Sequence, residues 1–498
     1  MSIWLRVLLA GLLFTVTISA QEPAKFEAQL KQGDAFLSRL RYEDAYLAFR
    51  GARESTEATQ RVRAATGMIR VLLRMSLYAE AGREGAALAA RDGRVAAALA
   101  VHGDTLWASG LFDEAERRYD EALALDQADP TALHGRGRAL AARRQFVPAR
   151  AAVLRAIAAA PAEPVYHYTL AAIDEDTRQF TQAAASLERY LDLLPSRDES
   201  EMAKWAAAQA AFLRGFRTLV PYDVPNERAS YTVPFRVEGD RVLVRGRLNG
   251  TADVEFALDT GTDQTTLTPA VASRAGVRPA MTLQSAGVGN LGAGFRTLQV
   301  ARLDQLEIGA LLIRNISALI KSPSLTEMPR REGAAFSPLA IGFSMEVDYS
   351  RLVLTLARRL PEASYPTRLP LRMLRLPVVR GTINHMPASF VIDTGGTAVS
   401  IGRLAAERLD VDPDTRRVPA RVYGTSGWDH TAFLLPFLEI ALAPGVGTSQ
   451  RSVVVLNLDA PSALLGFELG GILGHEFLRG YVLRIDLARA EVGLRPID

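Results

Sequence analysis

Two copies of the tripeptide Asp-Thr-Gly place acidic residues at Asp259 and Asp393. Each copy ends an apolar run, in Phe256–Thr262 (FALDTGT) and in Phe390–Gly396 (FVIDTGG). A single copy is often a surface turn whose Asp caps its own backbone. Two copies that follow matching runs, 134 positions apart, indicate one shared site instead. Two carboxyl groups held at one site can share a proton and activate a water molecule.

Buried strands are expected to deliver both carboxyl groups. The apolar runs are typical of such strands, and the Gly of each motif permits a tight turn and a close backbone approach. An alternating segment followed by Asn249-Gly250 predicts a hairpin before the first motif, and Leu376–Ile383 followed by Asn384-His385 predicts its counterpart. The correspondence continues beyond each Asp, where the matched pairs are Leu267 with Ile401, Arg274 with Arg408, and Val277 with Val411. These matches indicate an internal duplication.

The duplicated motif resembles the aspartic proteases, both pepsin-like and retropepsin-like, over residues 235–496, with the second copy the closer match. The resemblance implies an all-β, two-lobed acid-protease fold. It also implies that Asp259 and Asp393 form a catalytic dyad that hydrolyses peptide bonds with an activated water, without a metal or another cofactor. The residues expected to support the dyad, some by hydrogen bonds across the lobes, are Thr260, Gly261, Thr262, Thr394, Gly395 and Gly396. Gly396 departs from the small hydroxyl residue of the family.

The same resemblance predicts an apolar-apolar-Gly strand behind each Asp loop. We expect Ile472-Leu473-Gly474 in the second lobe and Ala340-Ile341-Gly342 in the first. This assignment makes the first lobe six residues shorter before its next Asp and removes a helical turn. Flaps over the substrate are expected at Gly-containing stretches, with Val288, Gly289, Asn290, Tyr423, Gly424 and Thr425 as candidates.

Residues 26–197 repeat with a period near 34. A small residue is followed twelve positions later by Ala in five units: Gly33 and Ala45, Gly67 and Ala79, Gly103 and Ala115, Gly137 and Ala149, Ala171 and Ala183. A larger residue follows four positions after the Ala in four units, whereas the second unit has Arg83 there. The pattern resembles tetratricopeptide repeats. It implies an all-α solenoid whose groove binds a peptide or protein partner; a spacer that only positions the second half is the alternative.

The end of this array is expected to lie against the following domain. Ser200 can cap a final helix that runs to about Leu219. Because a short linker with two prolines follows, we predict that Pro164–Leu219 packs beside the first lobe. The candidates for contact are Trp205, Phe212 and Phe216.

Residues 1–20 have a basic residue, an apolar run and Ala20 before Gln21, which predicts a secretory signal peptide. The protein is then exported, either periplasmic or secreted, with no membrane span after cleavage; an uncleaved anchor is the alternative. The formal net charge of +3, without a basic block, argues against nucleic acid as a partner. The absence of Cys excludes thiol catalysis and disulfides. A monomer is expected, because one chain supplies both Asp residues.

The expected domains are a signal peptide (1–20), a helical repeat domain (21–220), a linker (221–234), the first lobe (235–358), a connection (359–374) and the second lobe (375–498). The predicted function is an exported aspartic endopeptidase whose repeats bind its peptide or protein substrate or a partner. The alternative is a catalytically inactive protease-like protein that binds peptides or assists assembly. Gly396 and the apparently shortened first lobe motivate this alternative.

Overall fold

The computed structural model describes residues 24–195, 198–216, 219–285, 296–321, 334–409, 417–424, 427–450 and 452–497. The chain divides into two compact units. One unit comprises Met1–Gly137, Ala152–Glu163 and Leu193–Asp198, and the other comprises Arg138–Ala151, Pro164–Asp192 and Glu199–Asp498. The later helices therefore form one unit with the β region.

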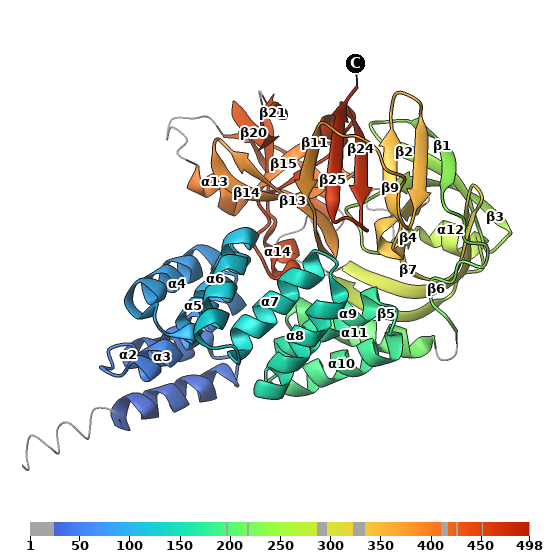
Figure 1. Cartoon of the computed structure of the whole chain (residues 1–498). Helices are drawn as coiled ribbons and strands as arrows, with labels where there is room; N and C mark the ends of the chain where they lie inside the picture. Colours follow the sequence, from blue (N-terminus) through green and yellow to red (C-terminus); the bar gives the residue numbers. More distant parts are fainter. Residues whose placement is uncertain are drawn as a thin grey trace, which may run out of the picture. The chain divides into compact units, whose positions relative to one another are not determined.

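Helices occupy the described residues up to 216 (Figure 1). After a helix at 24–37 they are α2 (Tyr42–Ala52), α3 (Ala58–Arg74), α4 (Tyr78–Asp92), α5 (Ala96–Ala108), α6 (Phe112–Leu125), α7 (Pro130–Ala142), α8 (Phe146–Ala159), α9 (Pro164–Asp176), α10 (Phe180–Leu193) and α11 (Glu201–Gly215). The turn inside each helix pair contains one residue with positive φ: Leu40, Ser76, Gly110, Arg144 and Arg178. Their spacing of 36, 34, 34 and 34 residues reproduces the predicted period.

Small and large residues alternate across the repeat interfaces, as the sequence predicted. The ring of Phe49 lies between Gly33 and Gly67, where a Cβ on either glycine would be 2.6 Å from a ring carbon. Tyr119 contacts Gly103 in the same way, at 2.5 Å. Only glycine allows the helices to approach these rings so closely.

The second repeat has a different register from the one predicted. Ala79 is exposed, whereas Ala81 is fully buried. The position four residues later is Gly85, and a Cβ there would lie 2.3 Å from the hydroxyl oxygen of Thr105. This shift of two residues explains why Arg83 did not fit the pattern: it lies outside the interface.

The first lobe consists of strands and two short helical segments. They are β1 (Tyr231–Val237), β2 (Val242–Leu248), β3 (Ala252–Leu258), β4 (Thr265–Leu267), α12 (Pro269–Arg274), β5 (Pro279–Ser285), β6 (Arg296–Ile308), β7 (Leu311–Ile320), β8 (Ala334–Phe336), η1 (Leu339–Ile341), β9 (Ser344–Asp348) and β10 (Val353–Ala357). The pairings β2–β3–β8–β4–β7–β6 return to β2 and close a barrel. Its core contains the edge-to-face rings of Phe256 and Phe336.

The second lobe repeats this plan. Its elements are β11 (Thr367–Pro370), β12 (Arg372–Leu374), β13 (Leu376–Ile383), β14 (Met386–Ile392), β15 (Val399–Gly402), α13 (Arg403–Arg408), β16 (Val418–Pro419), β17 (Val422–Gly424), β18 (Gly427–Asp429), β19 (Phe433–Leu435), β20 (Leu438–Ala443), β21 (Val446–Gln450), β22 (Val453–Leu456), α14 (Asp459–Leu465), β23 (Gly471–Leu473), α15 (His475–Leu478), β24 (Tyr481–Asp486) and β25 (Glu491–Pro496). Asn249 and Gly250 have φ of 49° and 66°, and Asn384 and His385 have φ of 45° and 66°. Both predicted hairpin turns are therefore present, with two left-handed residues each.

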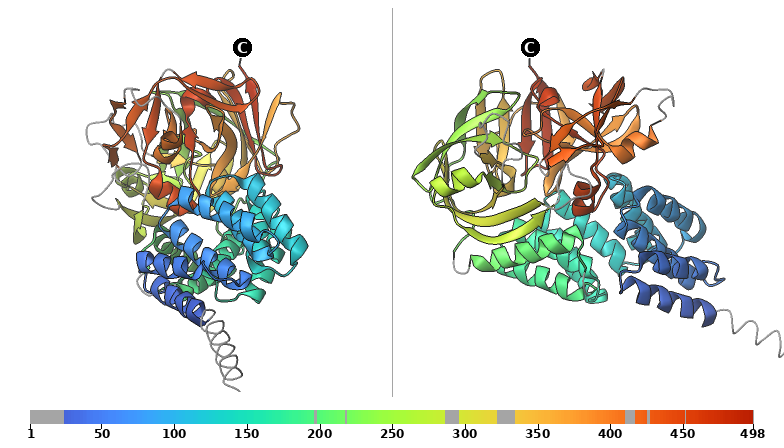
Figure 2. Two further views of the ribbon diagram at one scale, coloured as in Figure 1. Left: turned by 90° about the vertical axis from the view of Figure 1, so that its left-hand side faces the viewer. Right: turned by 180° about the vertical axis from the view of Figure 1, so that it is seen from behind.

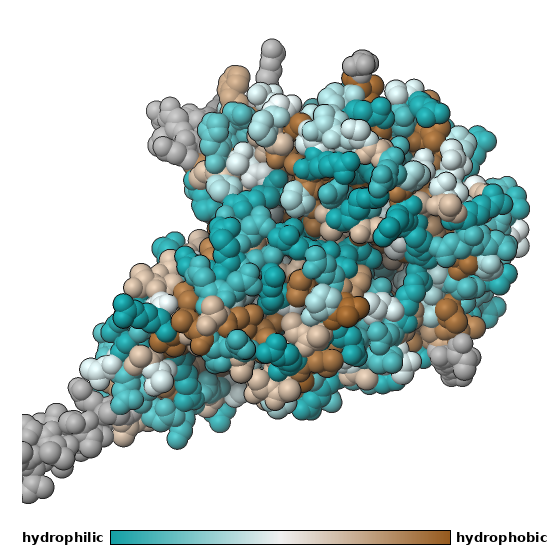
Figure 3. All heavy atoms as spheres, in the orientation of Figure 1, coloured by the Kyte–Doolittle hydropathy of each residue, from teal (hydrophilic) through white to brown (hydrophobic). Residues whose placement is uncertain are grey.

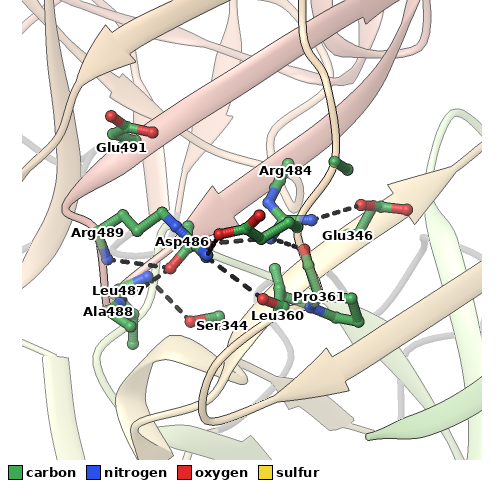
Figure 4. A network of polar contacts seen from close by, with 12 residues as sticks. Ser344, Glu346, Leu360, Pro361, Arg484, Asp486, Leu487, Ala488, Arg489 and Glu491 are labelled. Atoms are coloured by element: carbon green, nitrogen blue, oxygen red, sulfur yellow. Dashed lines mark hydrogen bonds and ion pairs between the residues drawn. The ribbon is translucent and has the colours of Figure 1, made fainter.

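A sheet shared by the two lobes contains the strands β11, β25, β24, β9, β10 and β1, in that order. A buried ion network supports the junction of β9 and β24 (Figure 4). The guanidinium of Arg484 donates to Glu346 at 3.1 Å and to Asp486 at 3.1 Å. Asp486 also accepts from Arg489 at 2.8 Å. Because Glu346 belongs to the first lobe and the other residues to the second, this network joins the lobes.

The last helices lie against the first lobe, as predicted (Figure 2). Arg178, in the turn between α9 and α10, donates to the carbonyl oxygens of Tyr222 at 3.0 Å and Ile341 at 3.3 Å. Ser200 caps α11 by accepting from the Ala203 N–H at 3.3 Å. Of the aromatic residues predicted to contact the first lobe, Trp205 instead contacts Arg375 at the start of the second lobe, whose guanidinium lies 4.0 Å from the ring centroid. Phe212 and Phe216 are buried and contact each other edge to face.

The chain thus combines a tetratricopeptide-type helical solenoid with an all-β, two-lobed acid-protease fold. In the part of the chain that the structure describes, no helix is both long and apolar enough to cross a bilayer. On the face drawn in Figure 3, hydrophobic residues lie among hydrophilic ones. The predicted signal peptide, residues 1–20, lies outside the described residues.

Candidate active site

Equivalent strand ends deliver the two Asp residues. Asp259 directly follows β3, and its N–H donates to the Phe336 carbonyl of β8 at 3.0 Å. Asp393 directly follows β14, and its N–H donates to the Leu473 carbonyl of β23 at 3.0 Å. The two Asp residues are partly exposed, and the negative charge of Asp259 acts on the carboxyl group of Asp393. The structure therefore brings the two predicted residues together.

Behind the carboxyl groups, Thr260 and Thr394 fasten the two loops to one another. The Thr260 hydroxyl donates to the Ile392 carbonyl at 2.6 Å, and the Thr394 hydroxyl donates to the Leu258 carbonyl at 2.8 Å. Each hydroxyl also accepts the backbone N–H of the other threonine. Both side chains are buried, so these bonds are protected from water. The cross-lobe hydrogen bonds inferred from the family resemblance are present.

The glycines of the two motifs leave room for the opposite carboxyl group. A Cβ on Gly261 would lie 2.5 Å from the carboxyl carbon of Asp393. A Cβ on Gly395 would lie 2.4 Å from the carboxyl carbon of Asp259. Any side chain at either position would separate the two carboxyl groups. The N–H groups of Gly261 and Gly395 each donate to the Asp of their own motif at 2.9 Å.

Loss of hydration raises the pKa of both carboxyl groups above the ordinary aspartate value. For Asp259, the positive charge of Lys321 opposes the increase. For Asp393, the negative charge of Asp259 adds to it, which raises the pKa of Asp393 to about 7. Two like charges in contact ionise in separate steps. The pair therefore retains a shared proton more readily than two isolated carboxyl groups would, and the charge of Asp259 favours the protonated form of Asp393.

The strand behind the first Asp loop differs from the predicted one. It is β8, Ala334–Phe336, which runs parallel to β3 as β23 runs parallel to β14. The predicted Ala340-Ile341-Gly342 instead follows this strand and includes most of the 3-10 turn η1. Ser337 thus corresponds to Gly474, and η1 corresponds to α15. The first lobe therefore has a helical turn and is shorter by one residue, not six, up to its next Asp.

Two of the supporting residues have contacts other than those inferred from the family. The Thr262 hydroxyl donates to the Gln264 carbonyl at 3.0 Å. The Gly396 N–H donates to Asp393 at 2.9 Å, so this carboxylate accepts one backbone bond more than Asp259 does among the described contacts. A Cβ on Gly396 would lie 2.8 Å from the Asp393 carboxylate, which leaves little room for a hydroxyl side chain.

The flap candidates are only partly described. Val288, Gly289, Asn290 and Thr425 lie outside the described residues. Tyr423 and Gly424 belong to β17, which pairs with β18 in a separate two-stranded hairpin. The backbone of a flap-like hairpin is therefore present in the second lobe.

Sequence reasoning missed three residues near the dyad. Lys321 follows β7, 62 positions after Asp259, and no motif marks it. Arg375 forms an ion pair with Asp263, in the loop after Asp259, and its Nε donates to that carboxylate at 2.9 Å. Asp263 follows the first motif directly but has no counterpart after Gly396, where Thr397 stands. This difference between the residues that follow the two motifs could have identified Asp263 from the sequence.

Comparison with known proteins gives matches for both halves. The family model described as "gag-polyprotein putative aspartyl protease" matches residues 244–328, which include Asp259. This match falls on the first lobe, although the motifs favoured the second. No curated protein sequence matches the chain. The C-terminal half is an aspartyl protease-like domain.

Solved structures similar to the chain include TTC0263, a thermophilic tetratricopeptide-repeat protein of Thermus thermophilus. It is 18% identical, with a TM-score of 0.31, and the match covers 38% of this chain and 98% of that one. Another is pilF of Pseudomonas aeruginosa, at 17% identity and a TM-score of 0.28, covering 40% of this chain and 87% of that one.

Proposed function

We propose that the protein is an aspartic endopeptidase in which Asp259 and Asp393 hydrolyse peptide bonds. The observation that supports this most directly is the close approach of the two carboxyl groups, held together across the lobes by Thr260 and Thr394. Each carboxyl group lies against the glycine of the other motif. This arrangement brings the two carboxyl groups close together, as a shared proton requires.

In the proposed reaction, ionised Asp259 acts as the general base and removes a proton from a water between the carboxyl groups. The water oxygen bonds to the carbon of the scissile peptide carbonyl, while protonated Asp393 donates its proton to the carbonyl oxygen. As the C–N bond of the tetrahedral intermediate breaks, Asp259 gives its proton to the leaving nitrogen. One hydroxyl group of the intermediate returns its proton to Asp393 as the product carboxyl group forms. The dyad ends with one proton, as it began.

Hydrolysis of a fluorogenic peptide library between pH 4 and 8 tests the proposal. We expect Asp259→Asn and Asp393→Asn each to lower kcat by about a hundredfold or more, because each removes a general acid or base. Asp253→Asn serves as the matched control, since its side chain is 84% exposed on the same hairpin. Equal cleavage by wild type and both dyad variants would rule out the proposal.

The alternative is a protein that binds peptides without catalysis. Of the two sequence features that favoured it, the shorter first lobe is not found in the structure. The first lobe has a helical turn and nearly the length of the second, so only Gly396 still favours that alternative. The same experiment decides between them. Peptide binding to the wild type at micromolar concentration, with no turnover at any pH tested, would establish the alternative.

We also propose that the protein is exported and that residues 1–20 are removed. The apolar run behind Arg6 and the small residue Ala20 support this. Mass spectrometry of the mature protein should find Gln21 at the N-terminus. Full-length protein retained in the cytosol would contradict export.

For the helical solenoid, we propose that it binds part of a protein substrate or a separate partner, as such arrays present extended concave surfaces.

The catalytic form is proposed to be a monomer, because both carboxyl groups come from one chain. Light scattering during gel filtration should give one chain, and specific activity should not depend on protein concentration. A rise in specific activity with concentration would contradict the monomer.

A further inference from the structure

Two arginines connect the last helices to the surroundings of Asp259. One reaches η1, which follows the strand behind Asp259, and the other reaches the loop that follows Asp259. Arg178 belongs to the helical array, in the turn between α9 and α10, and donates to the carbonyl oxygen of Ile341 in η1. Arg375 belongs to the second lobe and faces α11. All of these residues belong to the same compact unit.

The first connection reaches the strand behind Asp259. Ile341 follows β8 by five residues, and the last carbonyl of β8, that of Phe336, accepts the Asp259 N–H at 3.0 Å. Arg178 also donates to the carbonyl oxygens of Pro221 and Tyr222, at 3.3 and 3.0 Å. The Arg178 guanidinium therefore fixes the helical turn, the linker and the segment after β8 to one another.

The second connection reaches the loop after Asp259. The guanidinium of Arg375 lies 4.0 Å from the ring centroid of Trp205, on α11, and pairs with the carboxylate of Asp263. Tyr168, on α9, contacts Trp205 edge to face, with ring centroids 5.7 Å apart. Aromatic faces attract guanidinium groups most strongly when the pair is shielded from water. The Arg375 side chain is 20% exposed, so it meets this condition.

The same cluster contains a carboxyl group that the proposed reaction does not use. Glu175, on α9, accepts a hydrogen bond from the Gln209 amide at 2.6 Å. Loss of hydration raises the pKa of Glu175 to about 7, while Gln209 and the charge of Arg375 oppose the increase. When Glu175 is neutral, Asp263 is the carboxylate that pairs with the Arg375 guanidinium.

We propose that Arg178 and Trp205 are positioning residues for the Asp259 loop, so that helices α9–α11 are a fixed part of the peptidase domain. Arg178 restrains the backbone behind Asp259 through η1. Trp205 restrains the backbone after Asp259 through Arg375 and Asp263. The inference rests on the proposed function, because positioning matters only if Asp259 takes part in hydrolysis. It goes beyond it by assigning residues of the helical array to the site.

Hydrogen exchange of the full-length protein tests the inference without requiring catalysis. The reporter is the Gly261 amide, which donates to Asp259, and the internal reference is the Gly395 amide, which donates to Asp393. We expect Trp205→Ala and Arg178→Ala each to increase exchange in peptides covering 258–264 by about tenfold. Exchange in peptides covering 392–396 should change by less than about twofold on the same scale. Trp205→Phe, which keeps an aromatic face, should recover most of the protection.

Arg144→Ala is the matched control, because Arg144 occupies the same left-handed turn position one repeat earlier and pairs with Asp176. It should leave exchange in both loops unchanged. If hydrolysis occurs, Trp205→Ala and Arg178→Ala should lower kcat more than they raise KM. Unchanged exchange at 258–264, or an equal increase in both loops, would overturn the positioning role. Absence of hydrolysis in the wild type with the predicted exchange pattern would instead refute the proposed function alone.

Discussion

Thr260 and Thr394 bind one another twice: the N–H of each donates to the hydroxyl of the other, at 3.1 and 3.0 Å. The two hydroxyl groups then donate onward to carbonyl oxygens of the opposite strand. Four hydrogen bonds thus link two loops that are 134 residues apart in sequence. This closed arrangement sets the distance between the carboxyl groups, since each Asp precedes its threonine directly.

Replacing Thr260 by Val should therefore weaken the fold as well as hydrolysis. The change leaves the Thr394 N–H and the Ile392 carbonyl without their Thr260 partner, at about 1–3 kcal/mol for each buried group left unpaired. Thr260→Ser keeps the hydroxyl and should cost only about 1 kcal/mol. Urea unfolding monitored by circular dichroism measures both. Equal losses for the two variants would show that the hydroxyl is not the stabilising group.

The raised pKa of Asp393 predicts a stability change with a definite sign. An ordinary Asp ionises near pH 4 in the unfolded chain, whereas Asp393 in the folded chain ionises at about 7. Its ionisation therefore destabilises the fold progressively as pH rises from about 4 to about 7. Asp393→Asn should raise Tm at pH 8 and have little effect at pH 4. A Tm difference that is independent of pH would contradict the shift.

The same shift predicts the alkaline limit of hydrolysis. Protonated Asp393 is the proposed acid, so kcat/KM should fall about tenfold per pH unit above about 7.

Lys321→Met should change the dyad's titration by raising the pKa of Asp259, whose ionised form Lys321 favours. The acidic limb of the pH profile should then move to higher pH. A profile identical to that of wild type would show that Lys321 does not influence the dyad.

Asp486→Ala should destabilise the junction of the two lobes strongly. Arg484 is 8% exposed in its side chain, and the substitution removes one of its two carboxylate partners. Breaking a buried pair costs up to about 3–5 kcal/mol, and here Arg484 would keep only Glu346 as a carboxylate partner. Asp253→Ala, which breaks the exposed pair with Arg247, should cost less than about 1 kcal/mol. Denaturant unfolding of the two variants provides the comparison.

Phe49→Ala tests the packing of the helical repeats. The ring fills the space between Gly33 and Gly67, so its removal leaves a cavity and should cost about 3–5 kcal/mol. Leu47, on the same helix, is 52% exposed, and Leu47→Ala should change stability by less than about 0.5 kcal/mol. Similar effects of the two variants would mean that the glycine contacts do not carry the interface.

The sequence by itself determined the features that depend on local pattern. Asn249-Gly250 and Asn384-His385 predicted hairpin turns because few residues adopt positive φ in succession. The recurring Gly and Ala predicted helix pairs because close helix packing excludes larger side chains. The two Asp-Thr-Gly motifs predicted one shared site because a duplicated pattern indicates a duplicated fold, whose halves meet at equivalent loops.

Only the tertiary structure decided which distant segments meet. It selected Ala334–Phe336 over Ala340-Ile341-Gly342, because parallel pairing with β3 depends on strand register and not on composition. It placed Trp205 on Arg375 and Lys321 near Asp259, contacts that no local pattern encodes. The raised pKa of Asp393 also depends on tertiary structure, since loss of hydration and the charge of Asp259 arise only when the lobes are joined.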